Sequence, residues 1–337
     1  MAGVIKEWRA IVAAQHRRVD RIAIRRGASE VKRLFDAAHE ESLKHLRAQM
    51  KRTGGDSFST HQARQVVVLL QHGEQQLAAR MAQETKGVAK EARGEALHSL
   101  VANIERLEPE FRGADVRLQI EEAARFWGHE SILRRKHAEA DVQRARLLAA
   151  SKPVPQRIEE AFTRYSSDTI ADVEKQMALS VLENETPLAA IDRVSDAIDG
   201  EWWRAERIVR TESAYAFNEG HREGIEEAAT EVEGLGEFWS EYCDEDGEPL
   251  DERVAVDSIA MTSQVAYPGG VFVMPPRAPF PDAKGNMKVP NALAGESWPH
   301  PPNRPNDRSA LLPFSLTWGV PGWIWKDGRR VPIGNRE

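Results

Sequence analysis

The placement of proline constrains the fold of this sequence more than any other feature. Residues 4–150 contain a single proline, Pro109, whereas ten of the eighteen prolines lie between Pro268 and Pro305. Proline lacks a backbone N–H and its ring clashes with the preceding helical turn. We therefore expect long helices in the first half of the chain, and short strands with irregular structure in the proline-rich part.

Apolar residues in the proline-poor half recur at helical spacing. Leu69, Leu77 and Met81 form one such series, which predicts a helix with one buried face. No repeat of solenoid length is present, so long helical hairpins or a bundle are the expected architecture of residues 1–150.

Three breaks are predicted within this helical region. Residues 27–29 and 54–56 contain glycine and are expected to end two helices. Ser59 and Gln62 then have the spacing of a capping box, which predicts the start of a long third helix. Pro109 marks the entry to a fourth.

A second helical group is expected after residues 151–155, where two prolines interrupt the pattern. Apolar spacing predicts a helix over 158–181. Thr186 followed by Pro187 is typical of a capping residue with proline at the first helical position, and this helix should end at Gly200. A third helix is expected from about residue 201 to beyond 218.

Strand-forming stretches follow at 237–242 and 270–274. Near the end of the chain, Asp327-Gly328 is a hairpin turn signal, with tryptophans on the incoming strand and residues 329–333 on the return strand.

The sequence therefore predicts a mainly α N-terminal region, followed by a small α+β domain with a proline-rich meander and a C-terminal β-hairpin. The expected domains are a helical arm or bundle at 1–150, the α+β domain at 155–315 and the hairpin tail at 316–337.

Charge is distributed unevenly between the two halves. Residues 1–150 carry 27 Lys+Arg and 20 Asp+Glu, a net +7, while residues 151–337 carry 19 and 33, a net −14. Fourteen acidic residues and one arginine fall within 219–252. The basic half could contact DNA, but its charges are interleaved with glutamate, as on a solvated helical face.

Cys243 is the only cysteine, which excludes an internal disulfide and a multi-cysteine zinc site. No apolar run approaches the ~20 residues of a membrane span, and the N-terminus does not have the pattern of a signal peptide. We expect a cytoplasmic protein without a membrane partner, and no catalytic, cofactor-binding or metal site.

One helix carries an unusual set of polar residues. At helical spacing, Ile208, Thr211, Tyr215 and Asn218 fall on one face. Glu206 and Arg210 should form an ion pair at i,i+4 spacing. Polar groups on a buried face need hydrogen-bonding partners, so this face predicts a polar network.

An enzyme is the alternative interpretation of the same helix, because Arg210, Glu212, Tyr215 and His221 offer acid, base and cation. However, side chains at i and i+2 point to different faces, so Arg210 and Glu212 cannot share one substrate unaided. A structural network is therefore favoured. His300, between two prolines, is expected at the surface.

The helix resembles the Arg-Thr-Glu helix of the phage Mu F-like head-morphogenesis family. In that family an arginine, a threonine and a glutamate precede an aromatic residue, an asparagine and a glycine. The corresponding residues here are Arg210, Thr211, Glu212, Tyr215, Asn218 and Gly220.

A closing element of the same family is also matched in part. The family frame has two prolines, a histidine, a proline, an asparagine, and an arginine between two cysteines. The matching residues are Pro301, Pro302, Pro305, Asn306 and Arg308. Arg304 replaces the histidine, and Asp307 and Ser309 replace the cysteines, so the metal clamp or disulfide of some family members is not expected here.

The resemblance covers residues 155–315 and implies a role in building the phage head. It implies a structural minor head protein, made in the host cytoplasm and carried into the virion, with the portal protein or the major capsid protein as partner. DNA binding through residues 1–150, in packaging or ejection, is the alternative that stays open.

Overall fold

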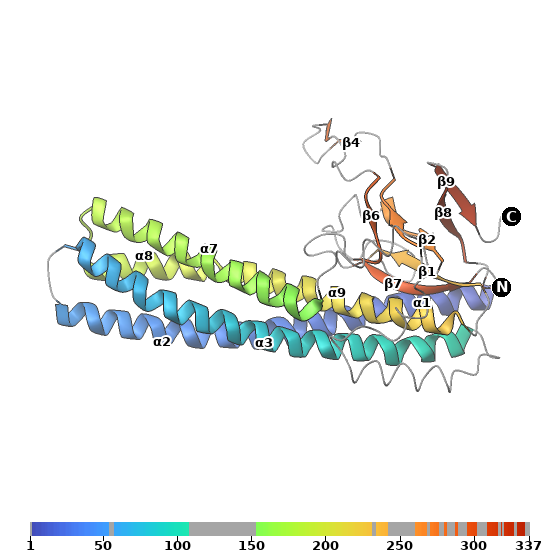
Figure 1. The fold of residues 1–337 in the computed structure, drawn as a ribbon, viewed down its shortest axis with the longest axis horizontal. Helices are drawn as coiled ribbons and strands as arrows, with labels where there is room; N and C mark the ends of the chain where they lie inside the picture. The colour runs from blue at the N-terminus through green and yellow to red at the C-terminus, as the bar shows by residue number, and fades with distance from the viewer. Residues whose placement is uncertain are drawn as a thin grey trace. The chain divides into compact units, whose positions relative to one another are not determined.

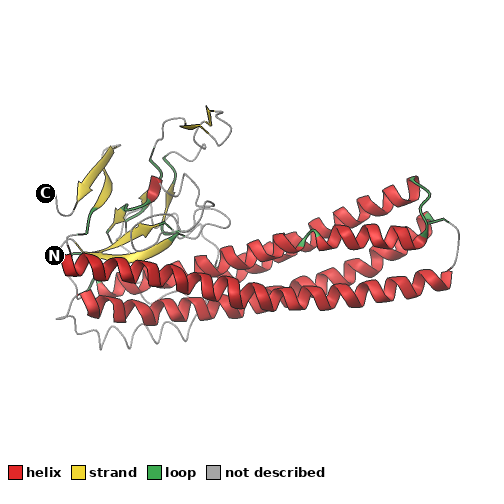
Figure 2. Cartoon of the chain, turned by 180° about the vertical axis from the view of Figure 1, so that it is seen from behind, coloured by secondary structure: helices red, strands yellow, loops and turns green. Residues whose placement is uncertain are grey.

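The computed structural model of the 337-residue chain is mainly helical, with short antiparallel strand pairs toward the C-terminus (Figures 1 and 2). This confirms the predicted fold class. The structure describes residues 2–53, 57–107, 153–230, 234–241, 260–267, 270–275, 280–281, 287–288, 295–301, 309–315, 318, 320–326 and 329–333.

The described helices follow the predicted pattern closely. They are α1 (Ala2–Asp20), the π-helical segment η1 (Arg21–Ala28), α2 (Ser29–Thr53), α3 (Thr60–Leu107), α7 (Val154–Leu182), α8 (Pro187–Asp199) and α9 (Trp202–Ala228). The expected break at 27–29 is wrong in one respect: the chain stays helical there and changes from π-helical to α-helical geometry. The helix predicted after Pro109 lies outside the described residues.

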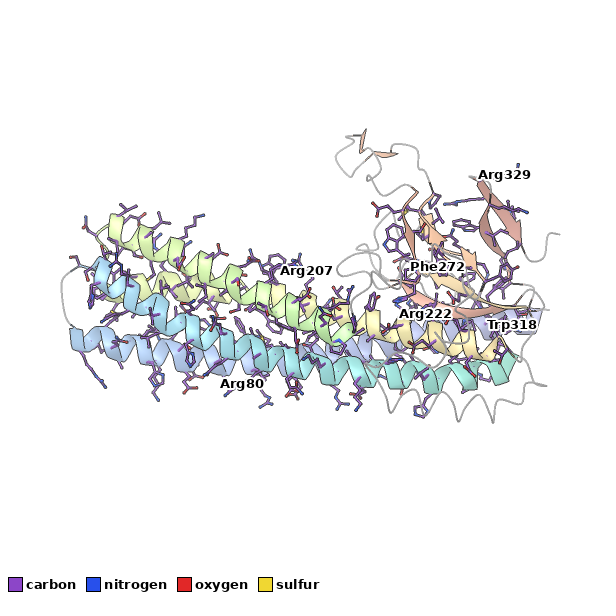
Figure 3. The ribbon with its side chains drawn as sticks, in the orientation of Figure 1. Arg80, Arg207, Arg222, Phe272, Trp318 and Arg329 are labelled. Carbon is purple, nitrogen blue, oxygen red and sulfur yellow. The ribbon has the colours of Figure 1, made fainter. Side chains whose placement is uncertain are left out.

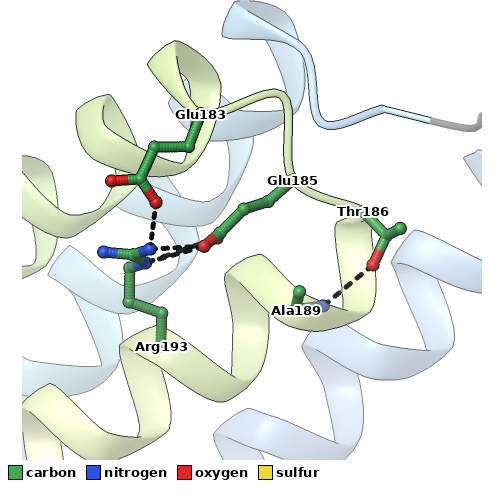
Figure 4. A network of polar contacts seen from close by, with 5 residues as sticks. All are labelled: Glu183, Glu185, Thr186, Ala189 and Arg193. Atoms are coloured by element: carbon green, nitrogen blue, oxygen red, sulfur yellow. Dashed lines mark hydrogen bonds and ion pairs between the residues drawn. The ribbon is translucent and has the colours of Figure 1, made fainter.

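Side-chain caps explain where two of these helices begin. The Ser59 hydroxyl accepts a hydrogen bond from the Gln62 backbone N–H at 3.3 Å, and the Ser59 N–H donates to the Gln62 side chain at 2.9 Å. This is the predicted capping box at the start of α3. At α8, Thr186 accepts from the Ala189 N–H at 3.2 Å, with Pro187 in the first helical position, as expected (Figure 4).

The turn between α7 and α8 is fastened by one arginine. Arg193 of α8 reaches back to Glu183 and Glu185, on either side of a residue with left-handed backbone, Asn184 (Figure 4). The hydrogen bond from Arg193 lowers the pKa of the Glu185 carboxyl. Phe58, just before α3, donates its N–H to the Glu185 carbonyl at 2.6 Å. This hydrogen bond joins the residues just before α3 to the turn between α7 and α8.

The strands form small antiparallel sheets. They are β1 (Leu235–Ser240), β2 (Val265–Ala266), β3 (Phe272–Val273), β4 (Phe280–Pro281), β5 (Met287–Lys288), β6 (Ser297–Trp298), β7 (Ala310–Ser315), β8 (Gly322–Lys326) and β9 (Arg329–Ile333). The order β2-β1-β7 makes up the largest sheet, while β3-β6, β4-β5 and β8-β9 form pairs. Lys326 pairs with Arg329, so β8 and β9 form the predicted hairpin.

The contacts between residues divide the chain into two compact units. Unit 1 comprises residues 1–22, 89–153 and 213–337, and unit 2 comprises 23–88 and 154–212. These units interleave along the sequence, whereas the predicted domains are consecutive. The physical reason is that α3 and α9 are long enough for each to contribute one part to unit 1 and the other to unit 2.

Unit 2 is a bundle of amphipathic helices. The predicted apolar face of α7 is buried through residues such as Ile158 and Phe162. On α3, Leu77 and Met81 are buried as expected, but Leu69 is 45% exposed and its neighbour Leu70 is buried instead. The prediction that Leu69 belongs to the buried face of α3 is therefore wrong, and Leu70 occupies that face.

Unit 1 places its core between the largest sheet and the helices. Trp8 of α1 packs edge-on against Phe238 of β1 with ring centroids 4.7 Å apart, and Phe238 stacks near Phe314 of β7. On β1, Trp239 meets Phe272 of β3 at 5.3 Å. Residues from the first and the last parts of the chain thus share one core.

Candidate functional site

The second part of α9 is buried on all sides although its sequence is polar. Every residue from 212 to 228 is buried. An ordinary amphipathic helix exposes its charged face, so here each polar group must be satisfied inside the protein. The charged or strongly polar members are Asn218, Glu219, His221, Arg222, Glu223, Glu226 and Glu227.

Two of these side chains bind the backbone of β7. The Asn218 amide donates to the Ser309 carbonyl at 3.0 Å, and its carbonyl accepts from the Leu311 N–H at 2.9 Å. His221, one turn further along α9, donates from Nδ1 to the Leu311 carbonyl at 2.6 Å. The helix therefore takes the place that a neighbouring strand would occupy.

A further outward-facing carbonyl of β7, that of Pro313, also has a hydrogen-bond donor. The indole of Trp8 donates to the Pro313 carbonyl at 3.4 Å, and Pro313 has no N–H that would require an acceptor. In the three-stranded sheet that the structure describes, β7 is an edge strand. Unpaired strand edges invite pairing with other chains, and this edge is closed by side chains of α9 and α1.

His221 is held in its neutral form. Its side chain is fully buried, and burial lowers its pKa to about 4. Because Nδ1 carries the proton that Leu311 accepts, Nε2 is the acceptor, and the Ser99 hydroxyl lies 3.5 Å from it. Ser99 in turn faces Gln15 of α1 at 3.2 Å. The imidazole therefore links α9 to α3 and α1 as well as to β7.

Ion pairs join α9 to the part of α3 in unit 1. Arg93 of α3 donates to the carboxylate of Glu223, and both side chains are almost fully buried. Arg222 donates to Glu226 at 2.9 Å and lies 3.7 Å from Glu223. Breaking one member of such a buried group leaves a charge without compensation, which typically costs ~3–5 kcal/mol.

Glycines permit this close approach. A Cβ added at Gly220 would lie 3.0 Å from the Arg93 carbonyl oxygen and 3.3 Å from the Ala96 Cβ. At Gly224 it would lie 2.3 Å from a methyl group of Leu100. Gly220 is also the glycine of the family-like motif, so its position here has a steric reason.

The Arg-Thr-Glu triplet does not converge on one point. Arg210 donates to Glu206 at 2.6 Å, which is the predicted i,i+4 pair. Thr211 donates to the backbone carbonyl one turn earlier. Glu212 receives two hydrogen bonds from Arg157 of α7, at 2.9 and 3.1 Å. These contacts all lie in unit 2, and each residue has a separate task.

The predicted apolar face of α9 is displaced by one position. Ile208 is only partly buried, whereas Val209 is fully buried. Beyond Glu212 the idea of one buried face does not apply, because the helix is covered on every side.

The described ends of the closing element lie against this same helix. The Tyr215 ring packs on His300 with centroids 4.6 Å apart, and His300 donates to the Pro301 carbonyl at 2.5 Å. Ser309, just after the element, is bound by Asn218. The sequence analysis expected His300 at the surface. This expectation is wrong, because His300 is only 2% exposed. Pro302, Pro305, Asn306 and Arg308 lie outside the described residues.

Ser309, at one of the family's cysteine positions, has a different use. Its hydroxyl donates to the Glu241 carboxylate at 2.9 Å. Serine and glutamate do not reproduce a thiolate clamp, so the residues do not fit the metal of the cysteine-bearing family members. Among the described residues, no group of three or more His, Cys, Asp or Glu side chains is placed to hold a metal ion.

A second buried polar cluster lies in unit 2. Burial, and secondarily the charge of Glu201, raises the pKa of Glu74 of α3 to about 7. Burial also raises the pKa of Tyr165 on α7. Glu201 pairs with Arg204 at 2.8 Å, yet burial leaves the pKa of Glu201 above its ordinary value.

Sequence reasoning missed several residues that surround the buried part of α9 in unit 1. Arg93, Gln15 and His16 belong to helices far away in the sequence, and His16 reaches Ser240 of β1 at 3.2 Å. Only the small-residue spacing of Gly220 and Gly224 could have indicated a closely packed partner helix. Comparison of the chain with protein-family models, with curated proteins and with solved structures gave no match.

Proposed function

We propose that this chain is a structural minor head protein of a tailed phage or prophage, which acts in capsid assembly by docking at the portal vertex or the capsid interior. The observation that carries the proposal is the contact between two segments about ninety residues apart. Tyr215 and Asn218 of the motif helix bind His300 and Ser309, which flank the closing element. These are the two segments that resemble the Mu F-like family.

The chemistry of the site supports a structural task better than catalysis. Asn218 and His221 form hydrogen bonds with the backbone of Leu311 in β7, and Glu212 accepts hydrogen bonds from Nε and Nη2 of Arg157. A general base must instead reach a substrate proton in a cleft. His221, fully buried, is used to fasten a strand.

The test of this proposal is genetic and biochemical. The gene is deleted from the phage or prophage that carries it, and the full chain is supplied from a plasmid. We expect deletion to abolish DNA-filled heads and complementation to restore them, with the protein present in purified heads together with the portal protein. Normal titre and normal heads without the gene would refute the proposal.

A matched pair of variants adds detail. Asn218→Ala should fail to complement because β7 loses its fastening, whereas Gln156→Ala, an exposed amide on α7, should complement fully. Failure of both variants would point to expression rather than to the site.

DNA binding is the second candidate, and it rests on the net charge of +7 in residues 1–150. Arg80 extends outward from α3 (Figure 3), as a phosphate-binding side chain would. Other cations are already paired, for example Lys32 with Asp36 at 2.8 Å. Binding of the full chain to duplex DNA that weakens steeply between about 50 and about 200 mM salt would favour this function.

The described residues contain no helix that is long and apolar enough to cross a membrane. The proposed path of the protein runs from the host cytoplasm during assembly to the virion.

A further inference from the structure

A long groove runs between α3 and α7 within unit 2. It consists of two cavities in succession. The first, of about 710 Å³, lies between residues 71–86 and 159–170, and the second, of about 640 Å³, lies between 60–68 and 174–182. Along the groove the residue numbers of α3 rise while those of α7 fall, so the two helices that form its walls are antiparallel.

Two of the most exposed apolar side chains of the described chain line the second cavity of this groove. Six large apolar residues are exposed in the described part of the chain, and four of them belong to α3, α7 and the start of α8. They are Val68 (66% exposed), Leu69 (45%), Leu182 (76%) and Leu188 (48%). Val68 and Leu182 both line the second cavity, and exposed apolar side chains that meet in this way on a folded protein mark an interaction surface.

The charges on the walls identify the occupant. Each cavity has one cation on α3 and one carboxylate on α7. Lys86 and Glu159 of the first cavity form an ion pair within the chain, whereas Arg64 and Glu174 line opposite walls of the second cavity. A copy of the same groove can face this one about a two-fold axis that runs either along the helices or across them. Isologous contacts of this type bring a patch against itself.

Only one of the two axes is electrostatically favourable. An axis across the helices would place Arg64 opposite the Lys86–Glu159 ion pair of the second copy, where Arg64 gains no net attraction. An axis parallel to the helices places α3 opposite α7 of the second copy, so that Arg64 of each copy faces Glu174 of the other. It also brings the exposed Val68 of each copy toward Leu182 of the other.

We propose that the α3–α7 groove is the contact surface between two copies of this chain, related by a two-fold axis parallel to the helices. The inference goes beyond the proposed function and does not depend on it. Small side chains along the walls, including Ala63, Ala79 and Ala178, allow the facing helices to approach closely.

The test begins with the oligomeric state of the full chain. Sedimentation equilibrium from about 1 to about 100 µM covers the range in which weak dimers dissociate. We expect a monomer–dimer equilibrium in the unmodified protein. Val68→Glu and Leu182→Glu should give monomers throughout, while Tyr267→Glu, an exposed aromatic outside the groove, should dimerise normally. A monomeric unmodified protein, or a dimer indifferent to both groove variants, overturns the proposal.

Charge reversal then tests the symmetry. Arg64→Glu and Glu174→Arg each replace two symmetry-related attractions by repulsions, and each should raise the dimer dissociation constant about tenfold or more. The double variant restores opposite charges and should recover dimerisation. Circular dichroism confirms that each variant is folded. If the double variant is as weak as the single ones, the axis parallel to the helices is wrong.

Discussion

Acidification should weaken unit 1 through His221, and the structure gives the size of the effect. Burial lowers the pKa of this histidine from 6.5 to about 4 in the folded protein. Above pH 6.5 the imidazole is neutral in both states, so its contribution is fully present. As pH falls from 6.5 toward 4, the unfolded chain takes up a proton that the folded chain refuses, and stability is lost.

The magnitude follows from the shift. Each unit of pKa difference corresponds to about 1.4 kcal/mol, so the loss approaches about 3 kcal/mol near pH 4. That is a large share of the ~5–15 kcal/mol that stabilises a typical folded protein.

The informative variant is His221→Asn. Its amide can still donate to the Leu311 carbonyl but does not titrate, so this portion of the acid sensitivity should disappear. The assay is urea unfolding followed by tryptophan fluorescence at intervals between pH 7.5 and 4.5. The control is His98→Asn, which replaces an exposed histidine on the part of α3 that belongs to unit 1. This variant should retain the steeper pH dependence of the unmodified protein. Identical pH profiles for His221→Asn and the unmodified protein would refute the reasoning.

Three further predictions concern stability. Glu74→Gln should raise the unfolding free energy at pH 8 by up to about 3 kcal/mol. The folded protein holds the pKa of the Glu74 carboxyl at about 7, so the stability that its proton provides is lost as pH rises from 4.5 through 7, and glutamine avoids this loss. Equal urea midpoints of the variant and the unmodified protein at pH 8 would count against the prediction. Asn218→Ala leaves a buried N–H and a buried carbonyl of the edge strand without a partner and should cost about 3 kcal/mol in urea unfolding, and a loss below about 1 kcal/mol would contradict the edge-closing role. A double-mutant cycle of Arg157→Ala and Glu212→Ala should show a coupling of about 1–2 kcal/mol, moderated because Arg157 is 31% exposed, whereas two catalytic residues would leave thermal unfolding unchanged.

The sequence was sufficient for features that depend on neighbours along the chain. The capping box at Ser59, the Thr186 cap, the pair between Glu206 and Arg210 and the hairpin of β8 with β9 were all predicted, because each depends on a few adjacent residues.

Features that depend on tertiary packing were not predictable in the same way. Periodicity cannot show that α9 is covered on all sides, since a run of glutamates is usually solvated. Nor could it identify Arg157 as the partner of Glu212, or place His300 in the interior. These contacts depend on which distant helix or loop arrives, and spacing along one element carries no such information.

The interleaving of the two units constrains the order in which the chain can fold during synthesis. Unit 2 draws on residues 23–88 and 154–212, so all its segments exist before the last third of the chain has been made. In unit 1, Trp8 must wait for Pro313, 305 positions later in the chain. Until translation reaches β7, helix α1 and the polar half of α9 lack the strand that they fasten. A nascent chain therefore carries these surfaces uncovered until that stage, and transiently exposed surface of this kind is prone to aggregation.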